Sequence, residues 1–240
     1  MADTTPKSYF WKGLRDGTPF IFVAIPFGTL FGVFATEAGL NIIQTIAFSA
    51  TVFAGAAQFT ALQLLQDNTP TAIVLASALA VNLRVAMYSA SLTPFLGSAP
   101  LWQRACAAYV TVDQSYACSI VQFEKDPKMT VPQRMAYFFG SVTPITPLWI
   151  LATYLGAVLG TQIPDSWALD FALPITFLAM IGPMMRTLAH VVAALVAIIV
   201  ALLVVAVPFN LGLLIAGAAG MIAGAQAELM FERRLEQRRS

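Results

Sequence analysis

Eight polar residues lie inside long apolar stretches of the chain, where a polar side chain is costly. They are Gln58 and Gln63, then Asn82, Arg84 and Tyr88, and finally Asp113, Gln114 and Ser115. Ionisable groups in such surroundings usually face a cavity or pair with an opposite charge. Arg84, in LAVNLRVAMYSASL, and Asp113, in VDQSYA, are the charged members of this set. An arginine and a carboxylate together could hold a charged or zwitterionic solute, or could relay a proton.

Other kinds of chemistry find little support in the residue types. The chain has one histidine, His190, and two cysteines, and no cluster of Cys, His and carboxylates with metal-ligand spacing. It also has no phosphate-binding loop and no nucleophile elbow. We therefore predict that the chain is not an enzyme and needs no metal or other cofactor. The net charge of +1 leaves no basic stripe for a nucleic acid.

The elements that position these residues are predicted to be membrane helices. The chain is 58% hydrophobic and 10% charged, whereas soluble domains carry roughly 25% charged residues. An apolar run of about 20 residues is long enough to cross a bilayer. Runs of about this length predict an all-α integral membrane protein with about eight transmembrane segments, at 18–38, 43–65, 71–92, 100–123, 136–160, 171–185, 189–207 and 209–228.

The distribution of Lys and Arg indicates the orientation of the chain. With a cytoplasmic N-terminus, Arg104 alone lies outside and Arg84 lies in the membrane, while all the other Lys and Arg lie inside. We expect both termini and the loop EKDPKMTVPQR to be cytoplasmic. The predicted regions are an interfacial segment at 1–17, a polytopic transport domain at 18–228 and a basic tail at 229–240.

The depth of the two charged residues allows them to meet. At 1.5 Å per residue, Arg84 lies about 12 Å and Asp113 about 20 Å from the outer ends of their runs. Two interpretations remain open. The pair could only neutralise itself and hold two helices together, or it could form a polar site with Gln58, Asn82 and Tyr88.

Two of the runs contain a helix breaker, Gly55 in 43–65 and Pro174 in 171–185. The segments around them, FAGAAQFTALQLL and FALPITFLAMIGP, are weakly similar. We therefore predict broken helices two and six, within an inverted repeat of helices one to three and five to seven, as in many secondary transporters. The run 171–185 is short, so it either spans the membrane or re-enters it.

Pairs of glycines four residues apart predict close helix packing. They are Gly28 with Gly32, Gly156 with Gly160, and Gly220 with Gly224. The contact could lie within the chain or at an interface with another subunit.

Five motifs in order resemble the AzlC family, the large subunit of two-component branched-chain amino-acid exporters. They are IPFGTLFG, FAGAAQFTALQLL, NLRVAMYSASLTPFL, VDQSYA and LDFALPITFLA, and the resemblance extends from about Phe10 to about Leu229. It implies export of branched-chain amino acids or their analogues across a bacterial inner (cytoplasmic) membrane, together with a small membrane partner, AzlD.

The resemblance also assigns residues. Gln58 falls in the family's AGAxQF motif, Asn82 and Arg84 in its NLRH motif with Tyr88 just after, and Asp113 in a TDESF-like motif. Val85 stands where the family usually has histidine, so a proton relay through that position is not expected here. A passive channel for a small solute and a non-transporting scaffold subunit remain as alternatives.

Overall fold

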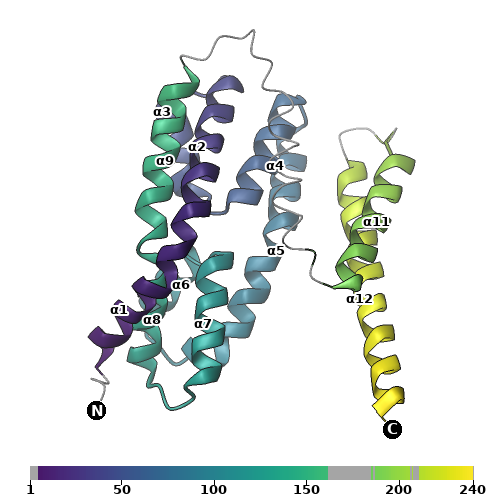
Figure 1. The fold of residues 1–240 in the computed structure, drawn as a ribbon. Helices are drawn as coiled ribbons and strands as arrows, with labels where there is room; N and C mark the ends of the chain where they lie inside the picture. Colours follow the sequence, from purple (N-terminus) through teal and green to yellow (C-terminus); the bar gives the residue numbers. More distant parts are fainter. Residues whose placement is uncertain (1–4, 162–184, 186, 206, 208–210, 240) are drawn as a thin grey trace. The chain divides into compact units, whose positions relative to one another are not determined.

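The computed structural model describes residues 5–161, 185, 187–205, 207 and 211–239 (Figure 1). All regular elements in these residues are helices, which confirms the all-α prediction. Two compact units are present, and each is described by itself. The first consists of Met1–Gln63 and Val81–Ile163, and the second of Leu64–Ala80 and Pro164–Ser240.

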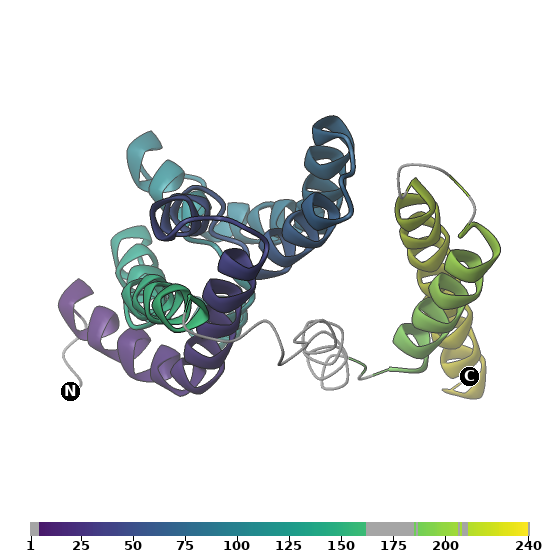
Figure 2. The same ribbon diagram turned by 90° about the horizontal axis from the view of Figure 1, so that it is seen from above.

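Two long helical segments form the centre of the first unit. They lie side by side in both views (Figures 1 and 2). A short distortion divides each of them: a 3-10 turn at Thr18–Phe20 divides the first, and Thr143–Pro144 the second. The helices are α1 (Pro6–Gly17) and α2 (Ile21–Glu37), then α8 (Val131–Val142) and α9 (Ile145–Gly160).

Glycines bring the two segments into backbone contact. A Cβ added to Gly32 would lie 2.1 Å from the carbonyl oxygen of Thr153, and one added to Gly156 would lie 2.0 Å from that of Thr29. Such distances leave room only for hydrogen at these positions. The glycine pairs of α2 and α9 therefore pack against each other within the chain.

The two segments run parallel, which corrects one prediction. Gly13 lies beside Tyr137 and Gly32 beside Gly156, so later residues of one segment meet later residues of the other. An inverted repeat whose halves begin with these two segments needs them to be antiparallel. The predicted inverted relation of helices one to three to helices five to seven is therefore wrong.

The run predicted at 43–65 is broken, as expected. It forms α3 (Ile42–Thr51) and α4 (Gly55–Gln66), with Val52–Ala54 between them. The buried amide of Gln58 donates to the carbonyl oxygens of Ser49, at 3.3 Å, and of Val52. α3 and the start of α4 are therefore held together as a helical hairpin.

The run predicted at 100–123 is not one spanning helix, and that prediction is wrong. It forms α6 (Leu101–Tyr109) and α7 (Asp113–Lys125), separated by Val110–Val112. α7 runs parallel to the second half of α5 (Thr71–Leu96), because Asp113 pairs with Arg84 near the start of α7 and Phe123 contacts Phe95 near its end. α6 runs the opposite way, so the pair is a second helical hairpin.

This reversal also moves Arg104. The residue lines a pocket with Leu96 and Gly97 at the C-terminal end of α5, where the guanidinium of Arg134 reaches the carbonyl oxygen of Phe95. Arg104 therefore lies at the same end of the unit as Arg134, and not at the opposite end as the charge count assumed. Lys12, Lys125 and Lys128 lie toward this end as well, since Lys12 contacts Gln122 and the other two lie at the connection of α7 to α8.

Four stretches of the described residues are long and apolar enough to cross a membrane. They are Pro6–Glu37, Thr71–Leu96, Val131–Gly160 and Leu211–Phe231. The other predicted runs are accounted for by the two hairpins and by the shorter apolar helix α11 (Leu188–Leu203). The run 171–185, including Pro174, lies outside the described residues except for Met185.

The second unit contains an antiparallel helix pair. α11 packs against α12 (Leu211–Arg239), where Gly220 lies beside Ala197 and Gly224 beside Ala193. α12 continues through the residues predicted as a basic tail. All three predicted glycine pairs are thus used for packing within the chain, and they give no support to an interface with another subunit.

Candidate functional site

Arg84 and Asp113 form an ion pair. The Nη1 atom of Arg84 lies 3.1 Å from Oδ2 of Asp113, and their side chains are 28% and 38% exposed. The Nε of Arg84 and Oδ1 of Asp113 are shielded from solvent without a hydrogen-bond partner in the described structure. The structure therefore forms the pair that the two depths allowed, and one buried polar atom of each member has no described partner.

Asp113 occupies the first turn of α7, at the tip of the second hairpin. Ser115 is buried, and its hydroxyl accepts from the N–H of Val112 and donates to its carbonyl oxygen, both at 3.0 Å. Val112 has no polar side chain to cap the helix. The first N–H groups of a helix lack partners within it and carry partial positive charge, which favours the Asp113 carboxylate and other anions.

Tyr88 borders the ion pair. Its ring stacks on that of Tyr116, with centroids 4.3 Å apart and planes 11° apart. The hydroxyl groups of Tyr116 and Ser91 lie 3.1 Å apart. These contacts fix α7 against α5 next to the two charges. Sequence reasoning missed Tyr116, which lies one helical turn after Asp113 and so on the same face.

Gln58 organises the tip of the first hairpin. Its amide nitrogen satisfies two carbonyl oxygens at the end of α3, while its Oε1 is buried without a described partner. Gly55 begins α4 against the indole of Trp149, whose Nε1 donates to the hydroxyl of Ser49 at 2.9 Å. Trp149 and Ser49 were not predicted, because neither is unusual in an apolar helix.

The tips of the two hairpins contact each other. The hydroxyl of Tyr109 donates to the carbonyl oxygen of Ala50, and its ring lies 6.2 Å from that of Phe53. Tyr109 and Asp113 flank the break in the second hairpin, while Ala50 and Gly55 flank the break in the first. Two helix N-termini, those of α4 and α7, therefore begin at the meeting hairpin tips.

The remaining predicted residues lie in different places relative to the ion pair. Asn82 and Gln114 are partly buried and flank the charges along the chain. Val85, also partly buried, follows Arg84 directly and provides no titrating group there. Pro174 is outside the described residues. The structure thus brings Arg84, Asp113, Tyr88 and Ser115 together around one hairpin tip, and places Gln58 and Gly55 at the other.

The role of Gln58 can be tested by changing it to Leu. This change removes the side-chain donor from the carbonyl oxygens of Ser49 and Val52, of which Val52 keeps the backbone N–H of Ala54 at 2.7 Å, so we expect a loss of about 1–3 kcal/mol of stability. The exposed Gln66 of the same helix provides the matched control, Gln66→Leu. Thermal melting in detergent measures both variants. Equal melting curves for the two would contradict a capping role for Gln58.

Comparison with known proteins decides the family. The family model described as AzlC protein matches residues 19–163, more than half of the chain and both hairpins. The chain belongs to the AzlC family. AzlC proteins are a transporter family and not an enzyme family. The match includes Gln58, Arg84 and Asp113, so the candidate site lies within the part of the chain that defines an AzlC protein.

Two relatives of this AzlC protein cover most of its length. Inner membrane protein YgaZ of Escherichia coli (strain K12) is 24% identical over 197 residues, which are 75% of this chain and 77% of YgaZ. An uncharacterized membrane protein of Archaeoglobus fulgidus is 27% identical over 231 residues, 95% of each chain. No solved structure matches the chain. The AzlC protein is therefore a multi-pass membrane protein with a homologue in an inner membrane.

Proposed function

We propose that this AzlC protein is a subunit of a secondary active, proton-coupled transporter that exports branched-chain or other small apolar amino acids. The observation that supports this most directly is the Arg84–Asp113 pair at the hairpin tip, with Nε of Arg84 and Oδ1 of Asp113 unused. A pair that served only to hold helices together would gain by satisfying these atoms.

The pair is complementary to a zwitterion. Arg84 would attract the carboxylate of the amino acid, assisted by the N-terminus of α7, and Asp113 would meet the ammonium group or take the coupling proton. Val85 cannot carry a proton, and it occupies the position where the family usually has histidine. The proposal therefore assigns the coupling proton to Asp113. Broken helices that present their ends to a solute are a recurring design in secondary transporters.

The end of the first unit that carries the basic residues is proposed to face the cytoplasm of a bacterial cell. Reassigning Arg104 to this end strengthens the charge bias that supports the orientation. Both termini would then be cytoplasmic, in the inner membrane. A small AzlD-like membrane subunit is part of the proposal because of the family, and the glycine pairs are not its docking surface.

Cysteine labelling tests the orientation. In a chain with Cys106 and Cys118 changed to Ser, Lys128→Cys should resist a membrane-impermeant maleimide in intact cells and react once the cells are opened. Leu40→Cys, in the connection between α2 and α3, is the matched position at the other end of the unit and should react in intact cells. The opposite result for both positions would show that the orientation is reversed.

Counterflow of labelled amino acids into liposomes tests the function itself. We expect labelled leucine to accumulate against unlabelled leucine when the chain is reconstituted with its small partner, and net export to depend on a proton gradient. Flux that follows the leucine gradient alone would instead support a passive channel. Full activity of the purified single chain would show that the partner is not required.

A further inference from the structure

A pocket of about 190 Å³ lies between the second half of α5 and α6, separate from the Arg84–Asp113 pair. Liquid water occupies about 30 Å³ per molecule, so the space is large enough for a small solute. Leu92, Leu96 and Ala107 form its buried apolar wall. A short apolar side chain could therefore rest in this pocket.

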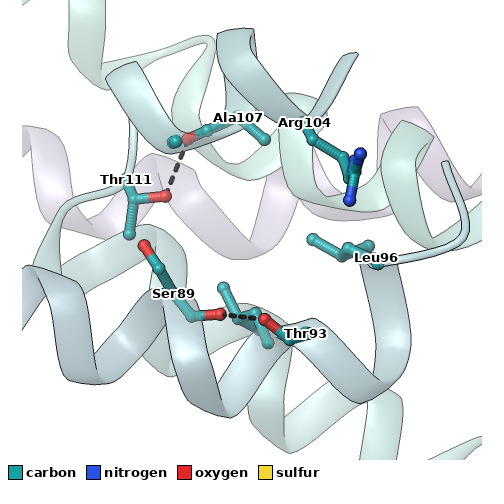
Figure 3. Close-up of a pocket in the computed structure, with 9 residues that line it drawn as sticks. Ser89, Thr93, Leu96, Arg104, Ala107 and Thr111 are labelled. Carbon is teal, nitrogen blue, oxygen red and sulfur yellow. Dashed lines mark hydrogen bonds between the residues drawn. The ribbon is translucent and has the colours of Figure 1, made fainter. Parts of the chain in front are cut away.

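Arg104 lies at one end of the pocket, and hydroxyl groups lie at the other (Figure 3). Arg104 is exposed, and its guanidinium has no partner among the residues that the structure describes. Ser89 and Thr111 face each other at the opposite end. The Thr111 hydroxyl donates to the carbonyl oxygen of Ala107 at 2.7 Å, which leaves its lone pairs available. The pocket is thus mainly apolar along its length, where the hydroxyl of Thr93 donates to the carbonyl oxygen of Ser89 at 2.8 Å, and it is cationic at one end.

The hydroxyl end of the pocket leads toward the ion pair. Thr111 precedes Asp113 by two residues in the hairpin tip, and Ser89 follows Tyr88, which stacks on Tyr116 beside the charges. Arg104 lies at the opposite end of the pocket, among the basic residues of the first unit. A solute entering at Arg104 would therefore move along α5 toward Arg84.

We propose that this pocket is a staging site for the substrate on the cytoplasmic side, an inference that rests on the proposed function. Arg104 binds the carboxylate of a small apolar amino acid, and Leu92, Leu96 and Ala107 contact its side chain. The amino acid then leaves Arg104, passes the hydroxyl groups of Ser89 and Thr111, and binds to the Arg84–Asp113 pair. Arg104 raises the local concentration of substrate, while Arg84 and Asp113 perform the transport step.

Protection of a cysteine from labelling tests this site without requiring transport. Ala108 lines the pocket and is exposed, so Ala108→Cys in a chain with Cys106 and Cys118 changed to Ser reports its occupancy. L-leucine should slow labelling by N-ethylmaleimide, and leucinol, which lacks the carboxylate, should not. Arg104→Gln should raise the leucine concentration for half-protection about tenfold, the effect of losing one charge-assisted contact. Arg104→Lys should retain most of the protection.

Arg84→Gln separates this inference from the proposed function. It should reduce transport in liposomes and leave the half-protecting leucine concentration within about twofold, as expected for independent sites. Absence of protection in a chain that transports leucine would overturn the staging site and leave the function standing. The role of Arg104 would be overturned if leucinol protected the cysteine as well as leucine does. It would also be overturned if leucine protected the Arg104→Gln variant at the same concentration as the wild type. A chain that neither binds nor transports leucine would overturn both proposals.

Discussion

Removing both charges of the ion pair should leave a folded protein that does not transport. The change is Arg84→Gln together with Asp113→Asn, which eliminates the unpaired ion that either single change would leave in an apolar environment. The two charges that we assign to the substrate carboxylate and ammonium are lost together. Leucine counterflow in liposomes, measured beside a melting curve in detergent, should show background transport with near wild-type stability.

The single variants provide the controls for this result. Arg84→Gln and Asp113→Asn should each reduce transport, and Asp113→Asn should also flatten the dependence of transport on pH if this carboxylate carries the coupling proton. A double variant that transports at a rate close to wild type would show that the two charges only hold α5 and α7 together. That outcome would remove Arg84 and Asp113 from the proposed site.

A methyl group at Gly156 should destabilise the first unit. The added Cβ would lie 2.0 Å from the carbonyl oxygen of Thr29, a backbone atom that can move only if α2 and α9 separate. Overpacking of this kind costs about 1–3 kcal/mol, or more where the helices must shift. We expect Gly156→Ala to lower the melting temperature in detergent, and to reduce transport because α9 carries Trp149 against the first hairpin.

Gly217→Ala is the matched control. Gly217 lies in α12, and no atom of the described residues lies within 4 Å of an added Cβ, while alanine favours a helix over glycine by about 1 kcal/mol. This variant should be as stable as the wild type or slightly more stable. If Gly156→Ala melted at the same temperature as Gly217→Ala, the close contact between α2 and α9 would be wrong.

Part of the site could be predicted because isolated polar residues in apolar runs carry information by themselves. Arg84 and Asp113 were identified from their charge alone, and their depths allowed a pairing that only the structure could establish. The break at 43–65 was found because Gly55 is a helix breaker in an apolar run. Tyr116, Trp149 and Ser49 could not be selected in this way, because tyrosine, tryptophan and serine are common in membrane helices and become notable only through their partners.

The sequence indicates the break between α6 and α7 less clearly than it indicates the break at 43–65. Val110–Val112 contains neither glycine nor proline, so the run 100–123 looks like one span. The polar sequence TVDQS from Thr111 is nevertheless typical of a helix N-terminus, with Asp113 in the first turn and Ser115 reaching back to cap Val112. Interpreted as a helix start, it would have predicted the hairpin and placed Arg104 at the same end of the unit as Arg134.

The sequence by itself determined that the chain is an all-helical membrane protein with two charges among apolar residues, and its motifs pointed to the AzlC family. These properties follow from residue type and local periodicity. The tertiary structure alone decided which apolar runs turn back as hairpins, the backbone contact of α2 with α9, and the meeting of the two hairpin tips. Hydropathy is the same whether an apolar run crosses the membrane or turns back within it, so only contacts between distant residues, such as Tyr109 with Ala50, could fix these choices.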